Sequence, residues 1–236
     1  VASLRGNQVT LWEESSKLGG HWSWLIRPYI AVQQTRLRES GVKIEMGKKA
    51  EIIAIKALHP DVVMVTQRAL IRWPSIPGLG QDNVFEAQKV LAGVEVGKTA
   101  VIIGGGNIGL EVADYLLRKG IGVTVLEPGP RPGSGLEWHA RKVLLNKLSQ
   151  KGVGILTNIT LNKLAGKKLL YQQGTLNNGV LEINADSFIL ALGSEPDEEL
   201  AESFKKDFQV ISLPYCERPG DVYRIAQEGA KAARRI

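Results

Sequence analysis

The chain has 236 residues, of which 44% are hydrophobic and 23% charged, and a formal net charge of +6. This balance is ordinary for a globular protein and allows one large or two small domains. No stretch approaches the roughly 20 apolar residues that cross a bilayer. The basic residues come in scattered pairs such as Lys48-Lys49, without the long basic stripe that nucleic acid requires. We therefore expect neither a membrane nor a nucleic-acid partner.

The first elements of the chain lead to an acid. Residues 1–5 are predicted to end a helix at Gly6, and residues 8–12 form a strand that runs into Glu13. A strand of this kind, closing on an acid, is the last part of a Rossmann nucleotide-binding unit. We therefore expect the first strand and glycine turn of this unit to lie upstream, in the same polypeptide or in a partner chain.

The segments that follow alternate between helical and strand-like patterns, with Gly and Pro between them. Up to residue 98 they are a turn at 17–20, a helix at 30–40, a strand at 42–46, β-like runs at 50–58 and 61–66, a proline-containing connection at 73–78 and a short helix at 87–91. After residue 127 they are a loop at 128–133, a helix at 136–151, a strand at 153–157, a β-meander of 160–164, 167–172 and 179–184, a buried strand at 186–193, a strand at 208–213 and a helix at 220–236.

The central segment carries the strongest motif. An apolar run, Val101-Ile-Ile103, leads into Gly104-x-Gly106-x-x-Gly109 and an amphipathic helix, and the next strand ends at Glu127. A dinucleotide needs this order, because the first glycine permits the tight turn, the second admits the pyrophosphate and the third lets helix and strand pack closely. The helix amino end then offers N–H groups to the phosphates. The expected contacts are Gly104, Gly105, Gly106, Asn107, Ile108 and Gly109.

Glu127 lies near the spacing of about 20 residues at which an acid binds the ribose 2′-hydroxyl. A carboxylate there repels a 2′-phosphate, so the sequence favours NADH, although the nearby Arg131 leaves NADPH open. A glycine turn that merely packs a βαβ unit, without binding a nucleotide, remains the alternative.

Several motifs in this order resemble the FAD- and NAD(P)H-binding module of two-dinucleotide-binding flavoproteins, in particular the C-terminal halves of 2,4-dienoyl-CoA reductase, 2-enoate reductase and trimethylamine dehydrogenase. The motifs are 9–13, 17–20, 76–78, 104–109, 191–196, 216–219 and 226–229. The resemblance implies an α/β, tandem Rossmann-like fold with three ββα/αβ layers. An NAD(P)H-binding domain, 95–196, would be inserted into an FAD-like domain, 1–94 and 197–236, that is truncated at its amino end.

In that family Gly104–Gly109, Glu127, Leu192 and Gly193 would line the NAD side, and Glu13 and Gly20 the FAD side. Other positions depart from the pattern. The family's Ala-Thr-Gly-Ala stretch reads Val-Thr-Gln-Arg at 65–68, its Gly-Asp pair reads Pro-Tyr at 214–215, and its first FAD fingerprint is absent. The resemblance therefore implies NAD(H) as cofactor and an incomplete or altered FAD pocket.

Neither a metal site nor a catalytic side chain is expected. His21, His59 and His139 stand far apart without the partners of a zinc site. The single cysteine, Cys216, has no second cysteine for a redox pair or an internal disulfide, which favours a cytoplasmic setting and a packing role beside the nucleotide pocket. Any chemistry would then belong to cofactors that the protein orients.

Two functions follow from these observations. The first is an oxidoreductase module that binds NAD(P)H, with NADH favoured, and passes hydride to a flavin held by the other domain or by a partner. The second is a non-catalytic domain that holds a nucleotide such as ADP and serves assembly, which the altered FAD features allow.

Overall fold

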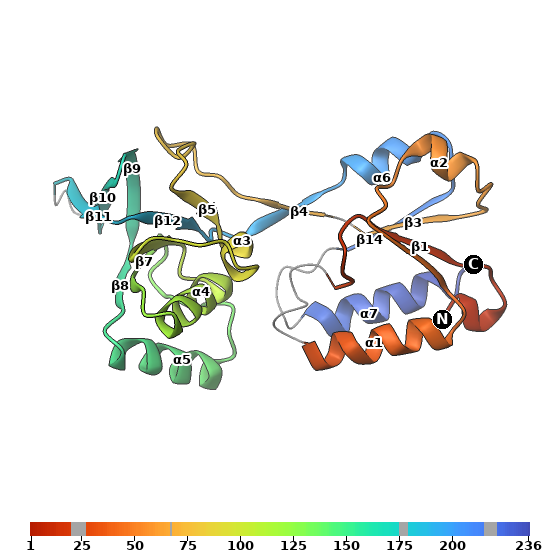
Figure 1. The fold of residues 1–236 in the computed structure, drawn as a ribbon, viewed down its shortest axis with the longest axis horizontal. Helices are drawn as coiled ribbons and strands as arrows, with labels where there is room; N and C mark the ends of the chain where they lie inside the picture. The colour runs from red at the N-terminus through yellow and green to blue at the C-terminus, as the bar shows by residue number, and fades with distance from the viewer. Residues whose placement is uncertain (20–26, 67, 175–178, 215–220) are drawn as a thin grey trace. The chain divides into compact units, whose positions relative to one another are not determined.

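The computed structural model describes residues 1–19, 27–66, 68–174, 179–214 and 221–236. It divides into two compact units (Figure 1): unit 1 comprises Val1–Leu70 and Pro196–Ile236, and unit 2 comprises Ile71–Glu195. Unit 2 is thus an insertion in the sequence of unit 1. In the sequence, unit 2 starts after Leu70, and β5 (Val84–Glu86) pairs with a strand of this unit.

Unit 2 is built on a parallel sheet of five strands in the order β5-β12-β6-β7-β8. The strand at its centre, β6, sends alternate side chains to opposite faces. Ala100 and Ile102 join one core cluster, and Val101 and Ile103 join the other. Both faces are therefore covered, as parallel sheets require. The bounds are β6 Thr99–Ile103, β7 Gly122–Glu127, β8 Gly154–Thr157 and β12 Ser187–Leu190.

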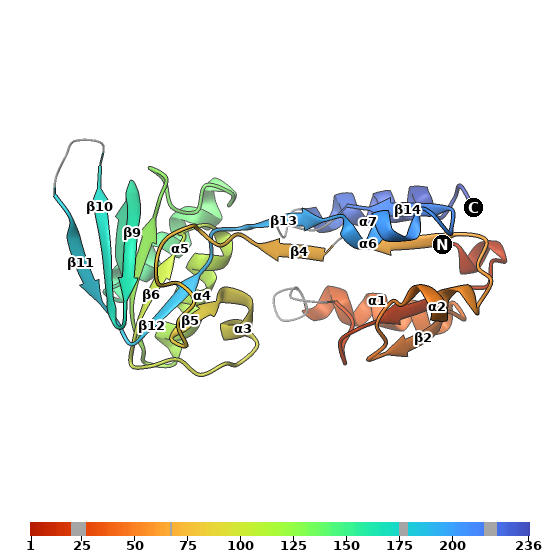
Figure 2. The same ribbon diagram turned by 90° about the horizontal axis from the view of Figure 1, so that it is seen from above.

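Three layers result from this packing (Figures 1 and 2). Helices α3 (Ala87–Leu91), α4 (Asn107–Arg118) and α5 (Trp138–Gln150) supply one core cluster. The other is supplied by an antiparallel three-stranded sheet, whose strands are β9 Ile159–Ala165, β10 Lys168–Gln173 and β11 Leu181–Asn184. The helix, sheet and meander predictions for this half of the chain are confirmed.

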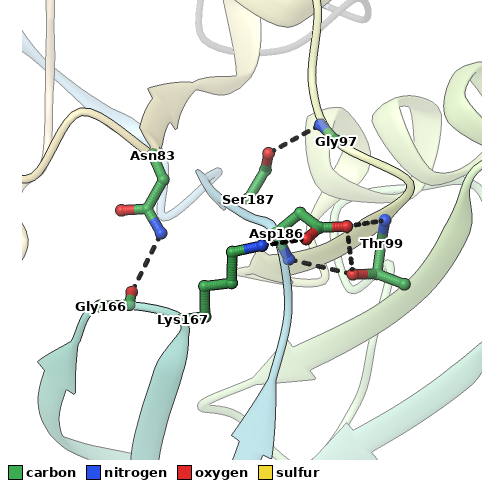
Figure 3. Close-up of polar contacts among 7 residues, drawn as sticks. All are labelled: Asn83, Gly97, Thr99, Gly166, Lys167, Asp186 and Ser187. Carbon is green, nitrogen blue, oxygen red and sulfur yellow. Dashed lines mark hydrogen bonds and ion pairs between the residues drawn. The ribbon is translucent and has the colours of Figure 1, made fainter.

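A polar cluster joins the β9–β10 turn to the start of β6 (Figure 3). Both the amide N–H and the hydroxyl of Thr99 donate to Asp186 Oδ2, at 3.1 and 3.0 Å, and Lys167 Nζ lies 2.7 Å from Asp186 Oδ1. These bonds lower the pKa of Asp186 to about 2, with the bond from Lys167 as the largest cause. Two further bonds lie beside them, from Asn83 Nδ2 to the Gly166 carbonyl and from the Gly97 amide to Ser187 Oγ.

Unit 1 contains two separate parallel strand pairs, β1 (Thr10–Glu13) with β2 (Lys43–Met46) and β3 (Val63–Thr66) with β14 (Val210–Leu213). A core around Ile55, Val65, Ala201 and Phe204 packs against them. The helices are a 3₁₀ turn Ser3–Arg5, α1 Arg27–Glu39, α2 Ile52–Lys56, α6 Glu199–Phe204 and α7 Asp221–Ala232. Where the chain passes between the units, β4 (Arg68–Ile71) pairs with β13 (Ser194–Asp197).

The β-like prediction for residues 50–58 is wrong, because this segment contains helix α2. Ile52 and Ile55 pack into the core of unit 1 while Ile53 is 84% exposed, which is helical spacing and not strand alternation. Helix α6 is absent from the sequence prediction. The tandem Rossmann-like α/β fold class is confirmed. None of the helices in the described residues is long and apolar enough to cross a membrane.

Candidate functional site

Two glycines of the central turn stand where no side chain fits. Gly104 has φ +107°, and a Cβ there would lie 2.4 Å from the carbonyl oxygen of Ala191. A Cβ on Gly109 would lie 1.9 Å from the carbonyl oxygen of Gly104. The first glycine thus lets the chain turn beside the end of β12, and the third lets α4 start against the turn itself.

The amino end of α4 is open. Gly106 is its N-cap residue, no side chain caps it, and a Cβ on Gly106 would meet nothing within 4 Å. The first turn of a helix has N–H groups without intrahelical partners and a partial positive charge. Gly106, Asn107 and Ile108 therefore present uncapped backbone donors beside free space, which is the geometry an anion requires.

Glu127 reaches this turn from the end of β7. Its Oε2 accepts the amide N–H of Gly105 at 2.6 Å, and its Oε1 accepts that of Gly129 at 2.6 Å. The expected acid therefore does lie beside the glycine turn. A carboxylate has about four acceptor positions, so two bonds leave capacity for a hydroxyl donor.

Leu192 and Gly193 follow β12, the neighbour of β6 in the sheet. Gly193 has φ +85°, and its carbonyl accepts the amide N–H of Arg72 at 3.1 Å. The sheet order reverses at β6, because β7 and β8 lie on one side and β12 and β5 on the other. Crevices for ligands occur at such switch points, outside the carboxyl ends of the strands. Gly104–Gly109, Glu127 and Leu192–Gly193 all follow strands at that edge.

Glu111, in the second turn of α4, was given no role in the sequence analysis. Its Oε2 is shielded from solvent and has no hydrogen-bond partner in the described part of the chain, and burial raises the pKa of this carboxyl to about 7. Asn107, one helical turn earlier, also has a buried oxygen, Oδ1, without a described partner. The sequence signal that could have singled out Glu111 is its place in α4, as an acid two positions after Gly109, the last glycine of the motif.

Glu13 and Gly20, the two residues expected on the FAD side, do not come together in a described site. Glu13 ends β1 in unit 1, where its Oε1 accepts the amide N–H of Ser15 at 2.8 Å. Gly20 lies outside the described residues, as do Gln67 and Cys216. No cluster of metal-ligating side chains occurs among the residues that the structure describes.

A family model for "Pyridine nucleotide-disulphide oxidoreductase" matches residues 62–210, more than half of the chain. The chain belongs to this family. The resemblance to the C-terminal module of enoate reductases is also confirmed, because the relatives of the chain include reductases of that type.

Three relatives illustrate the match. The chain is 29% identical over 99% of its length to bilirubin reductase of Mediterraneibacter gnavus, and 28% identical over 96% to NADH oxidase of Thermoanaerobacter brockii. Among solved structures, a 2-naphthoyl-CoA reductase covers 100% of the chain at 26% identity and a TM-score of 0.88. The chain spans 38%, 36% and 37% of these proteins, respectively.

Both cofactors of the family can be tested against the residues present. For NAD(H) they fit: an uncapped helix end, free space at Gly106 and an acid at the end of β7 stand together. For FAD the fit is partial. The sequence has a single G-x-G-x-x-G, in unit 2, and the described residues of unit 1 supply Glu13 beside a sheet divided into two strand pairs.

Proposed function

We propose that unit 2 binds a pyridine dinucleotide, with the pyrophosphate over the amino end of α4 and the adenosine ribose at Glu127. The observation that carries this proposal is the uncapped helix end at Gly106, with no atom within 4 Å of a Cβ built there. Gly104–Gly109 would hold the phosphates through backbone N–H groups, and Leu192 and Gly193 would form the neighbouring wall of the site.

We propose NADH as the preferred coenzyme. A 2′-phosphate would meet the negative charge of Glu127, whereas a 2′-hydroxyl can donate to it. Arg131 is exposed, two residues beyond the Gly129 amide that Glu127 binds. An arginine in this loop is the feature that would favour NADPH if the proposed preference were reversed.

The proposed activity is that of the NAD(P)H-binding module of a flavoprotein oxidoreductase. A bound NAD(P)H would supply hydride-transfer chemistry, with a flavin as the acceptor. The names NADH oxidase and cinnamate reductase among the relatives support this class. The chain's own residues would bind and orient the dinucleotide, and the final acceptor would be set by the rest of the enzyme.

We propose that the described residues of unit 1 do not by themselves form a flavin site. Rossmann units place a glycine turn after a central strand, and neither the motif nor a strand between the two pairs of unit 1 is present in the described residues. The same observation favours the second candidate, a non-catalytic domain that holds a nucleotide such as ADP and serves assembly.

A titration with NADH, followed by nucleotide fluorescence, combined with the flavin absorbance spectrum of the purified protein, tests the proposal. We expect saturable binding of NADH, weaker binding of ADP and, where flavin is retained, its bleaching by NADH without oxygen. A colourless protein that binds ADP as tightly as NADH would favour the assembly role. Absence of any nucleotide binding would overturn both functions.

A further inference from the structure

Glu127 does more in this structure than end a strand beside the glycine turn. Its two oxygens each accept a backbone N–H at 2.6 Å, from Gly105 within the turn and from Gly129 in the loop that follows β7. Hydrogen bonds to an ionised acceptor are roughly twice as strong as neutral ones. The Glu127 carboxylate therefore ties Gly105 to the end of β7.

The loop after β7 fastens the same glycine from its other side. The amide N–H of Gly133 donates to the Gly105 carbonyl at 2.6 Å, so both peptide groups of Gly105 are engaged. Arg141, from α5, donates through Nε to the Pro132 carbonyl at 2.6 Å and holds the loop in place. The glycine turn and residues 128–133 are thus joined by hydrogen bonds, and Glu127 contributes a side-chain acceptor to each of them.

We infer that Glu127 is a positioning residue for the glycine turn, in addition to its proposed contact with the ribose. This inference rests on the proposed function. Loss of the carboxylate would loosen Gly105 and, next to it, the uncapped donors at Gly106 that would receive the pyrophosphate. The binding of any dinucleotide would then weaken, whether or not its adenosine carries a 2′-hydroxyl.

The test is Glu127→Gln, because glutamine keeps the size of the side chain but has one acceptor oxygen and an NH₂ group that opposes the second N–H. Affinities for NADH and for its analogue lacking the adenosine 2′-hydroxyl are measured by calorimetry, well below the unfolding temperature. We expect both affinities to fall: that for the analogue about tenfold, for one lost charged hydrogen bond, and that for NADH by at least as much, because its ribose contact is lost as well. Glu182→Gln, an exposed change of equal charge on β11, is the matched control.

The outcomes separate this inference from the proposed function. If the wild-type protein binds no NADH, the proposed function fails. If it binds NADH and the substitution weakens only the ligand that has the 2′-hydroxyl, Glu127 contacts the ribose alone and the inference is wrong. A role in fold stability alone would leave both affinities of the folded protein unchanged.

A second variant covers the case in which Glu127→Gln does not fold. Arg141→Met removes the bond to Pro132 and leaves Glu127 intact. We expect a smaller loss of affinity, equal for the two ligands, and unchanged affinity for both would contradict the inference.

Discussion

The glycines of the central turn have different physical tasks, and a pair of substitutions separates them. Gly109→Ala places a methyl group 1.9 Å from a backbone oxygen, whereas Gly106→Ala places one in free space at φ −70°, which alanine adopts readily. We expect Gly109→Ala to lower the free energy of unfolding by about 2 kcal/mol. Gly106→Ala should change it by less than about 0.5 kcal/mol, and should weaken NADH binding about tenfold through crowding of the phosphates.

Urea unfolding and NADH titration of both variants check this division. Equal stability losses would show that the two glycines share one structural task. Unchanged NADH affinity in Gly106→Ala would show that the free space at this residue is not where the phosphates bind.

Glu111 gives the protein a pH dependence of defined sign. Its pKa rises from 4.5 to about 7 in the folded chain because burial disfavours the charged form. Between these values the folded state keeps a proton that the unfolded state has lost, so stability falls as the pH rises from 4.5 to 7. Glu111→Gln removes this titration. We expect it to stabilise the protein at pH 8 relative to wild type by on the order of 1 kcal/mol, since partial exposure screens the effect, and to have little effect at pH 4.5.

Urea unfolding at the two pH values measures this difference, with Glu95→Gln at an exposed position as the control. A stability difference between Glu111→Gln and wild type that is the same at both pH values would contradict the assignment of the raised pKa to Glu111.

Residue positions were predictable where they depend on a local pattern. The positions of Gly104, Gly109 and Glu127 follow from the motif, since the turn admits only one backbone path. The isolation of the Glu111 carboxyl did not follow, because it depends on which atoms from other elements surround that helix face. The engagement of Glu127 by the Gly129 amide likewise depends on the path of a loop that the motif does not specify.

At the scale of elements, the Asp186 cluster in Figure 3 joins the meander to the parallel sheet, and its contribution should depend on pH. The pKa of Asp186 is lowered from 3.8 to about 2, first by Lys167 and then by Thr99. Its stabilising effect is therefore present above pH 3.8 and is lost as the pH falls towards 2. We expect Asp186→Asn to lower the melting temperature at pH 7 and to flatten the acid limb of the stability curve.

Melting temperatures of both proteins, measured from pH 7 down to pH values below 3.8, test this expectation. Glu182→Gln, which breaks the exposed ion pair with Lys168, should have little effect because such pairs contribute little. The same acid dependence in Asp186→Asn and in wild type would show that the cluster does not stabilise this junction.

Elements with strong periodicity were predictable, and short apolar ones were not. Strand β6 is an apolar run and helix α4 has a clear period, with three glycines between them. The sequence of helix α2 predicts a strand, because five residues with three isoleucines, Ile52-Ile-Ala-Ile-Lys56, favour β structure locally. Packing of Ile52 and Ile55 on the core of unit 1 overrides that preference.

At the scale of the whole molecule, the insertion of one unit in another was visible in the order of motifs. No local signal in the sequence assigns β5 to the sheet of unit 2, because its partner β12 is about 100 residues away in the chain. The described residues of unit 1 contain two separate parallel strand pairs, β1 with β2 and β3 with β14. The chain spans 38% and 36% of two relatives.

The central claim places a dinucleotide over the amino end of α4, and amide chemical shifts in ¹⁵N-labelled protein test it most directly. On addition of NADH we predict the largest shift changes at the backbone amides of Gly106, Asn107 and Ile108, with smaller ones at Gly105. Shift changes that leave these amides untouched, or that occur only in unit 1 near Glu13, would contradict the account.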